Sequence, residues 1–243
     1  MISKPLDRFL YWIDEAARDT AGQMAVDEVL LRDKAADPIL RVYRWSEPAI
    51  TVGYFEDAER ARLQMNERTV PLVRRFTGGG TVSHGADLPY SIIIPKRVCD
   101  AVFGNDRVAS YRVIHQALAK TLEGLGMSDV VSATQGDQRI GAPCFVSPVR
   151  EDLIHEQSGQ KIAGAGQRRT REGIIHQGSI DLMGHDVDRE VFGRMLAAHL
   201  AENVQKLTEA QLPSDFDDQW QALRAKRYAT ARWNRDLSGS KVR

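Results

Sequence analysis

The chain has 243 residues, with 33 lysines and arginines against 33 aspartates and glutamates and a pI near 7.0. This balance gives no overall field that would attract nucleic acid or a membrane surface, so we expect neither as a partner. No stretch approaches the roughly 20 apolar residues that span a bilayer, and the length allows a sizeable core, so we expect a cytoplasmic protein with a single domain over residues 1–243.

The first predicted helix covers residues 22–34. Thr20 and Gln23 form a capping-box pattern before it, and apolar residues then recur on one helical face. Asp27 and Glu28 lie inside this helix, and we interpret them as part of a solvated face rather than as catalytic carboxylates.

Strand patterns dominate the part of the chain that follows. Residues 39–45 and 49–54 are rich in β-branched and aromatic residues and predict a strand pair joined by a short loop. A helix is predicted next, followed by three strands, at residues 57–67, 70–76, 81–84 and 90–95 respectively.

The second half mixes strands with more helix. Apolar residues recur every three or four positions over 108–125 and predict a long helix, and a hairpin is predicted over 152–164 with its turn at Ser158 and Gly159. A strand follows, and the segment from about 187 to 243 reads as helical, with the predicted elements at 174–182, 187–203 and 215–228. Strands interrupted by a few helices indicate an α+β fold with mixed or antiparallel sheets flanked by helices.

A glycine run stands between two predicted strands. Three consecutive glycines imply positive φ angles or close approach of another group to the backbone. Bare backbone N–H groups beside two arginines suit a phosphate, a carboxylate or a thioester oxygen, whereas a glycine-rich bulge between packed strands is the structural alternative. The candidate binding residues of this segment are Arg74, Arg75, Gly78, Gly79, Gly80 and His84.

Two residues stand out as chemical groups. Cys144 is a strong nucleophile by type, although a cysteine beside Phe145 is also a common small core residue. Lys161 lies among small residues near Gly164, where it either reaches a pocket or remains an exposed hairpin lysine.

Several further residues are less decisive. The arginines of 168–171 suit an acidic partner or phosphates, or a solvated surface, and His176 either faces a pocket or ends a buried strand. Cys99 is interpreted as structural. With no Cys-x-x-Cys or His-x-x-x-His spacing, we expect no metal site.

Four segments together carry a resemblance to a known family. They read Arg-Arg-Phe-Thr-Gly-Gly-Gly-Thr-Val-Ser-His (74–84), Lys-Ile-Ala-Gly-Ala-Gly-Gln-Arg-Arg (161–169), His-Gln-Gly-Ser-Ile (176–180) and Lys-Arg-Tyr-Ala-Thr-Ala-Arg-Trp-Asn (226–234). The chain resembles the biotin/lipoyl protein ligase and octanoyltransferase superfamily along almost its whole length.

The resemblance implies an α+β catalytic domain that attaches a medium-chain acyl group to a lysine of a lipoyl-domain protein. Such acceptors include the glycine cleavage H protein and the E2 subunit of 2-oxoacid dehydrogenases. Octanoyltransferases of this fold take octanoate from acyl carrier protein through a cysteine thioester and need no cofactor, whereas lipoate ligases use ATP and Mg²⁺ to form lipoyl-AMP. Cys144 stands where the cysteine-dependent transferases carry their nucleophile, and Arg150-Glu151-Asp152 replaces the Asn-Asp pair usual in ligases, so transfer is favoured.

Roles follow from the resemblance. Cys144 would attack the octanoyl thioester, Lys161 would position its carbonyl and favour the thiolate, and the glycine run with His84 would line the acyl tunnel. Arg74, Arg75 and the 168–171 cluster would dock an acidic carrier or lipoyl domain, or contact ATP phosphates in a ligase. A non-catalytic acyl- or lipoyl-domain-binding module is the third alternative.

Overall fold

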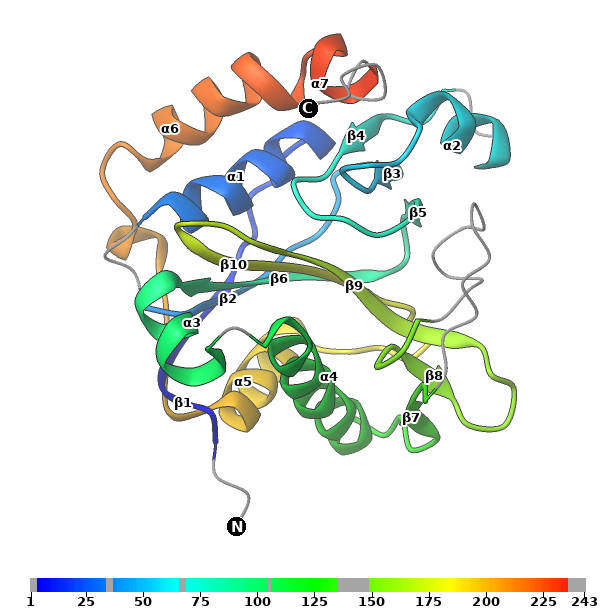
Figure 1. The fold of residues 1–243 in the computed structure, drawn as a ribbon, viewed down its shortest axis with the longest axis vertical. Coiled ribbons are helices and arrows are strands. Elements are labelled where there is room, and N and C mark those ends of the chain that lie inside the picture. Colours follow the sequence, from blue (N-terminus) through cyan, green and yellow to red (C-terminus); the bar gives the residue numbers. More distant parts are fainter. Residues whose placement is uncertain (1–3, 34–36, 66–68, 105, 135–148, 236–243) are drawn as a thin grey trace.

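The computed structural model describes residues 4–33, 37–65, 69–104, 106–134 and 149–235 (Figure 1). The chain forms three layers, with a central sheet between two groups of helices (Figure 1). A smaller sheet lies beside one of the helical layers.

Eight strands form the central sheet: β1 (Leu6–Ile13), β2 (Ile39–Val42), β6 (Leu88–Pro95), β7 (Val130–Ser132), β8 (Leu153–His155), β9 (Lys161–Arg169), β10 (Gly173–Ile180) and β11 (Ala201–Lys206). Their order in space is β11-β1-β2-β6-β10-β9-β8-β7. β1 runs parallel to β2 and β11, and the remaining neighbours are antiparallel. This mixed sheet confirms the predicted α+β class, and the β8–β9 pair confirms the predicted hairpin.

Helices cover both faces of this sheet. One face carries α3 (Lys96–Phe103), α4 (Arg107–Gly124) and α5 (Arg189–Leu200), and the other carries α1 (Thr20–Arg32) with α6 (Phe216–Leu223) outside it (Figure 1). A π-helical turn (Arg224–Tyr228) and α7 (Ala231–Arg235) follow α6. Because α1 lies between the sheet and α6, nearly all of its residues are buried.

The small sheet has the order β4-β3-β5, with β3 (Ala49–Val52), β4 (Leu72–Arg74) and β5 (Val82–His84). Helix α2 (Ala58–Met65) follows β3 and buries Ala58 and Ala61 against Ile50 and Val52. The glycine run connects β4 to β5, as predicted.

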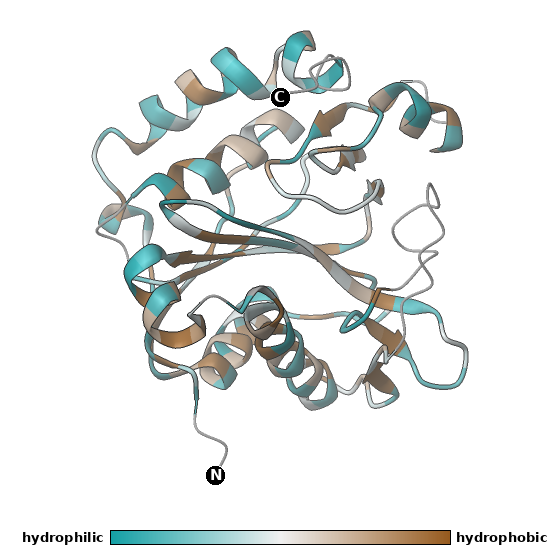
Figure 2. Ribbon diagram, viewed as in Figure 1, coloured by the Kyte–Doolittle hydropathy of each residue, from teal (hydrophilic) through white to brown (hydrophobic). Residues whose placement is uncertain are grey.

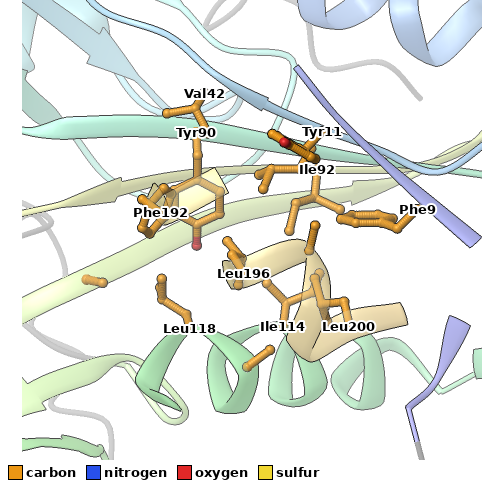
Figure 3. Close-up of a cluster of buried hydrophobic side chains, with 14 of the residues drawn as sticks. Phe9, Tyr11, Val42, Tyr90, Ile92, Ile114, Leu118, Phe192, Leu196 and Leu200 are labelled. Carbon is orange, nitrogen blue, oxygen red and sulfur yellow. The ribbon is translucent and has the colours of Figure 1, made fainter. Parts of the chain in front are cut away.

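The largest apolar cluster lies between the central sheet and α4 and α5. Figure 3 shows Tyr90 and Ile92 of β6 facing Leu118 of α4 and Phe192 and Leu196 of α5. Figure 2 shows the outer helix α6 mostly hydrophilic, which fits its position as the outermost element. The core therefore fixes the central strands from which the site is built.

Three sequence predictions fail at element boundaries or pairings. The segments 39–45 and 49–54 do not pair with each other, because β2 is buried between β1 and β6 while β3 joins the small sheet. Residues 201–203 are not helical; they begin β11, a polar edge strand whose composition is as helix-like as that of α5. The cap of α1 is Asp19, whose side chain accepts from the Gly22 N–H, rather than Thr20.

Within the described ranges, no helix combines the length and the apolar character needed to cross a bilayer.

Candidate active site

A narrow pocket lies between the small sheet and the central sheet. Its walls come from β3 and β5 on one side and β9 and β10 on the other, with Met24 of α1 and Trp45 adding apolar surface. The cavity volume is about 30 Å³, so the pocket is a small slot in this structure. Four of the predicted site residues line it: Arg75, His84, Lys161 and Gly164.

Lys161 is buried at the pocket wall, not exposed at the hairpin rim. Its Nζ lies 2.8 Å from Oδ2 of Asp152, and the two side chains are 2% and 0% exposed. Asp152 also accepts hydrogen bonds from the Tyr111 hydroxyl at 2.6 Å and the Val149 N–H at 2.7 Å. A fully satisfied carboxylate thus fixes the ammonium group beside the pocket.

Asp152 and Tyr111 are site residues that the sequence analysis did not assign. Asp152 lies one residue before β8, and Tyr111 reaches it from α4, 41 residues earlier in the chain. The one available signal was the position of Asp152 in the segment that corresponds to the Asn-Asp pair of ligases. For Tyr111 the helical pattern indicated a core residue and nothing more.

Gly164 makes room for the Lys161 side chain. A Cβ at Gly164 would lie 2.3 Å from Cε and 2.4 Å from Nζ of Lys161, well below any normal contact. The Lys161 chain therefore runs directly beneath this glycine to reach Asp152.

The glycine run forms a tight joint between the two sheets. Gly79 has φ of +93°, and a Cβ on Gly53 would lie 1.7 Å from the Gly79 carbonyl oxygen. On the other side, a Cβ on Gly166 would lie 2.3 Å from the Gly78 carbonyl oxygen. Close packing against the run therefore requires glycine at positions 53 and 166, whereas glycine at position 79 is required by its positive φ.

Arg75 is held by the same run. Its guanidinium donates to the Gly78 and Gly80 carbonyls at 3.2 and 2.8 Å and to Thr51 Oγ1 at 2.7 Å. Of the three glycines, none is among the residues that line the pocket, and Gly78 lines a neighbouring groove instead. The glycines act on the pocket by placing Arg75.

His84 is fixed on both ring nitrogens. Nε2 is hydrogen-bonded to Thr51 Oγ1 at 2.8 Å and Nδ1 to Asp87 Oδ2 at 2.7 Å, while the ring packs against Trp45 with centroids 4.4 Å apart. Burial raises the pKa of Asp87, but hydrogen bonds from His84 and Ser179 outweigh it, and the pKa is lowered. The imidazole therefore forms a rigid pocket wall.

A buried polar network that includes Asp27 connects to the residue before the glycine run. The prediction that Asp27 is solvated is therefore wrong. Asp27 is fully buried, with Oδ1 2.7 Å from Arg41 and Oδ2 2.8 Å from the Gln177 amide. Gln177 in turn accepts from Thr77, which precedes the glycines, at 2.8 Å. Glu28 is buried too, under Arg227 and Tyr228 of the C-terminal segment.

Arg74, a predicted binding residue, is not among the described residues that line the pocket. The residue is fully buried and its guanidinium donates to five backbone carbonyls, those of Gly53, Tyr54, Glu56, Trp233 and Asn234. It fastens α7 to the small sheet.

His176, a predicted substrate-binding residue, is not among the described residues that line the pocket. It is fully buried, 3.3 Å from the Tyr90 hydroxyl and 3.3 Å from Gln167 Oε1, with the Tyr111 ring close by. Burial holds its pKa well below the ordinary histidine value.

The free energy of unfolding should fall as the pH falls from 6.5 towards 4. Burial lowers the pKa of His115, which stacks on Tyr111, to about 4, and lowers that of His176 as well. Below pH 6.5 the unfolded chain binds protons at these residues and the folded chain does not, so protonation favours unfolding, by about 3 kcal/mol for His115 alone. Urea unfolding across this range measures the slope.

The matched variants are His115→Leu, which should flatten that slope, and His185→Gln, which changes an exposed histidine and should leave it as it is. Equal slopes for wild type and His115→Leu would contradict the assignment.

The two cysteines differ in what the structure describes. Cys99 is buried in the main core, as its structural interpretation predicted. Cys144 lies outside the described residues.

The arrangement is that of the lipoate protein ligase fold. A bi-partite lipoate protein ligase from Thermoplasma acidophilum superposes with a TM-score of 0.71 at 20% identity, covering 98% of this chain and 100% of that one. An ATP-bound lipoate-protein ligase A gives 0.69 at 23% identity, covering 94% and 98%. Residues 19–223 match the family described as "Lipoyl protein ligase A/B catalytic domain", and the chain belongs to that family.

Curated relatives carry a more specific name. Octanoyltransferase LipM of Bacillus cereus is 35% identical over 70% of this chain and 64% of its own length, and LipM of Staphylococcus aureus is 32% identical over 73% and 67%. The chain thus spans a little under two thirds of the Bacillus cereus relative.

Proposed function

We propose that the protein is an octanoyltransferase of the lipoyl pathway. It moves an octanoyl group from acyl carrier protein, through a thioester on Cys144, to the acceptor lysine of a lipoyl-domain protein such as glycine cleavage H protein or a 2-oxoacid dehydrogenase E2. The observation that carries the proposal is the buried Lys161 ammonium, held by Asp152 at the wall of a slot with apolar lining. The LipM relatives support the same reaction.

Two displacements complete the reaction. The Cys144 thiolate attacks the carrier thioester, the bond from the acyl carbon to the carrier sulfur breaks, and the carrier thiol takes up a proton. The acceptor lysine amine then attacks the acyl-cysteine, an amide forms, and Cys144 leaves as thiolate while the amine loses its proton. Lys161 stabilises the negative charge that develops on the carbonyl oxygen in both steps.

The apolar walls of the pocket support an acyl substrate. Met24, Trp45 and Val82 line it and suit the hydrocarbon part of an acyl group, for which the walls must move apart because about 30 Å³ holds roughly one or two water molecules. Met24 is the one flexible, unbranched side chain of the three, so it is the wall that adjusts to the chain.

Substitution of the nucleophile tests the proposal. Wild type with octanoyl carrier protein and an unmodified lipoyl domain should octanoylate the domain without ATP, and mass spectrometry should find the octanoyl group on Cys144 in the absence of acceptor. Cys144→Ala should abolish both products, whereas Cys99→Ala, the same change in a core cysteine, should retain them. Unchanged transfer by Cys144→Ala would remove the covalent mechanism.

A second reaction mixture tests the ligase reaction. Free lipoate with ATP and Mg²⁺ should leave the lipoyl domain unmodified, since the proposed transfer needs neither nucleotide nor metal. Lipoylation at a rate comparable to octanoyl transfer would favour the ligase function instead.

Gly164→Ala should lower the transfer rate by about 10- to 100-fold, since an added methyl group displaces the Lys161 side chain and small misplacements of a catalytic group are costly. Gly85→Ala is the matched control, because a Cβ there meets nothing within 4 Å. Initial rates of both variants, with their unfolding curves, provide the comparison. Wild-type activity in Gly164→Ala would show that the observed position of Lys161 is not needed.

A further inference from the structure

A wide groove lies on the other side of the glycine joint from the pocket. Its volume is about 590 Å³, compared with about 30 Å³ for the pocket. Three of the large apolar side chains that the described chain exposes line it: Phe55 at 90%, Val108 at 48% and Val149 at 42%. Apolar exposure concentrated in one groove is typical of a binding surface.

The groove is also positively charged. Arg150, Arg168 and Arg169 line it, and Glu151 is the acidic residue among its described lining. The Arg168 guanidinium lies 4.5 and 4.1 Å from the ring centroids of Tyr54 and Phe76, so it is presented on an aromatic platform. Arginine and aromatic residues are the types enriched where proteins dock.

The groove and the pocket are connected by residues that contact both. Tyr111 lines the groove, and its hydroxyl binds Asp152, the carboxylate that holds Lys161. Gly78 lines the groove, and its carbonyl packs against Gly166, which lines the pocket. A group bound in the groove therefore lies next to the residues that hold Lys161.

We propose that this groove docks the acidic domain that presents the acceptor lysine. Its positive lining attracts acidic surface residues of the partner, and Phe55 takes an apolar residue beside the target lysine. The same arginines disfavour the protonated form of an incoming lysine and so favour the neutral amine that attacks the acyl group. The reacting group of the donor is an uncharged thioester, which has no proton for the arginines to disfavour. The groove is therefore assigned to the acceptor rather than to the donor.

This docking proposal rests on the proposed function for the identity of the acceptor. A binding measurement tests the docking separately from the octanoyl-transfer reaction. Titration calorimetry with an unmodified lipoyl domain needs no turnover. Phe55→Ala should weaken binding about tenfold, and Leu63→Ala, an equally conservative change at a 71% exposed leucine of α2, should leave it unchanged.

A second pair of variants tests the contribution of charge to binding. Arg150→Glu should weaken binding and reduce its salt dependence, whereas Arg97→Glu, at a 59% exposed side chain of α3 outside the groove, should do neither. Equal binding by Phe55→Ala and Leu63→Ala, or no binding of the domain to wild type, would overturn the proposal. So would a Phe55→Ala protein that binds the domain normally but is loaded slowly by octanoyl carrier protein. Absence of octanoyl transfer with these binding differences intact would instead count against the proposed reaction alone.

Discussion

Replacing Lys161 with methionine should lower the rate of octanoyl transfer by about 100- to 1,000-fold, the effect of removing one donor to a developing oxyanion. Methionine keeps the length and apolar stem of the side chain, so the change isolates the ammonium group. Initial rates at saturating donor and acceptor measure it. A fall of less than about tenfold would show that Lys161 does not stabilise the reacting carbonyl.

The same substitution also changes stability, and a second variant separates the two effects. Without Lys161, Asp152 is a buried carboxylate that keeps the Tyr111 hydroxyl and the Val149 N–H as donors from the described residues, and the free energy of unfolding should fall by about 3 kcal/mol. Adding Asp152→Asn removes the uncompensated charge. The double variant should therefore regain stability while its transfer rate stays low, whereas joint recovery would mean that Lys161 acts through folding.

Local sequence patterns correctly predicted the elements whose structure depends on residues close together in the chain. Apolar spacing predicted α4 nearly to its ends, and the hairpin of β8 and β9 followed from a turn whose Gly159 has φ of +68°. The glycine run was correctly placed between two strands because three glycines in succession need a geometric reason wherever they stand.

Those local patterns could not predict which distant strands pair with each other. β11 pairs with β1 across about 190 residues, and its polar composition gives no strand signal. Lys161, Asp152 and Tyr111 meet because three separate elements converge, so only Lys161 was marked by its own surroundings in sequence. The role of the arginine pair also depended on tertiary structure, since Arg75 lines the pocket while Arg74 turns away into the fold.

Asp27→Asn should lower the free energy of unfolding by about 3–5 kcal/mol, the cost of breaking a buried charge pair. Sequence reasoning places Asp27 on a solvated helix face because charged side chains are rarely fully buried. In the structure Asp27 faces the central sheet, where it accepts hydrogen bonds from Arg41 of β2, Ser91 of β6 and Gln177 of β10. An amide there turns one acceptor into a donor that faces another donor.

Asp100→Asn is the control for this variant, because Asp100 pairs with Lys96 on the surface with a side chain 52% exposed, and its loss should cost less than about 1 kcal/mol. Asp27→Asn should also loosen the pocket, since Gln177 lines it and links Asp27 to Thr77 at the start of the glycine run. Hydrogen exchange over residues 75–84 should then quicken by more than the global loss of stability explains. Equal stability of the Asp27→Asn and Asp100→Asn variants would show that Asp27 is exposed to solvent. Unchanged hydrogen exchange in the glycine run would show that the polar network does not stabilise the pocket.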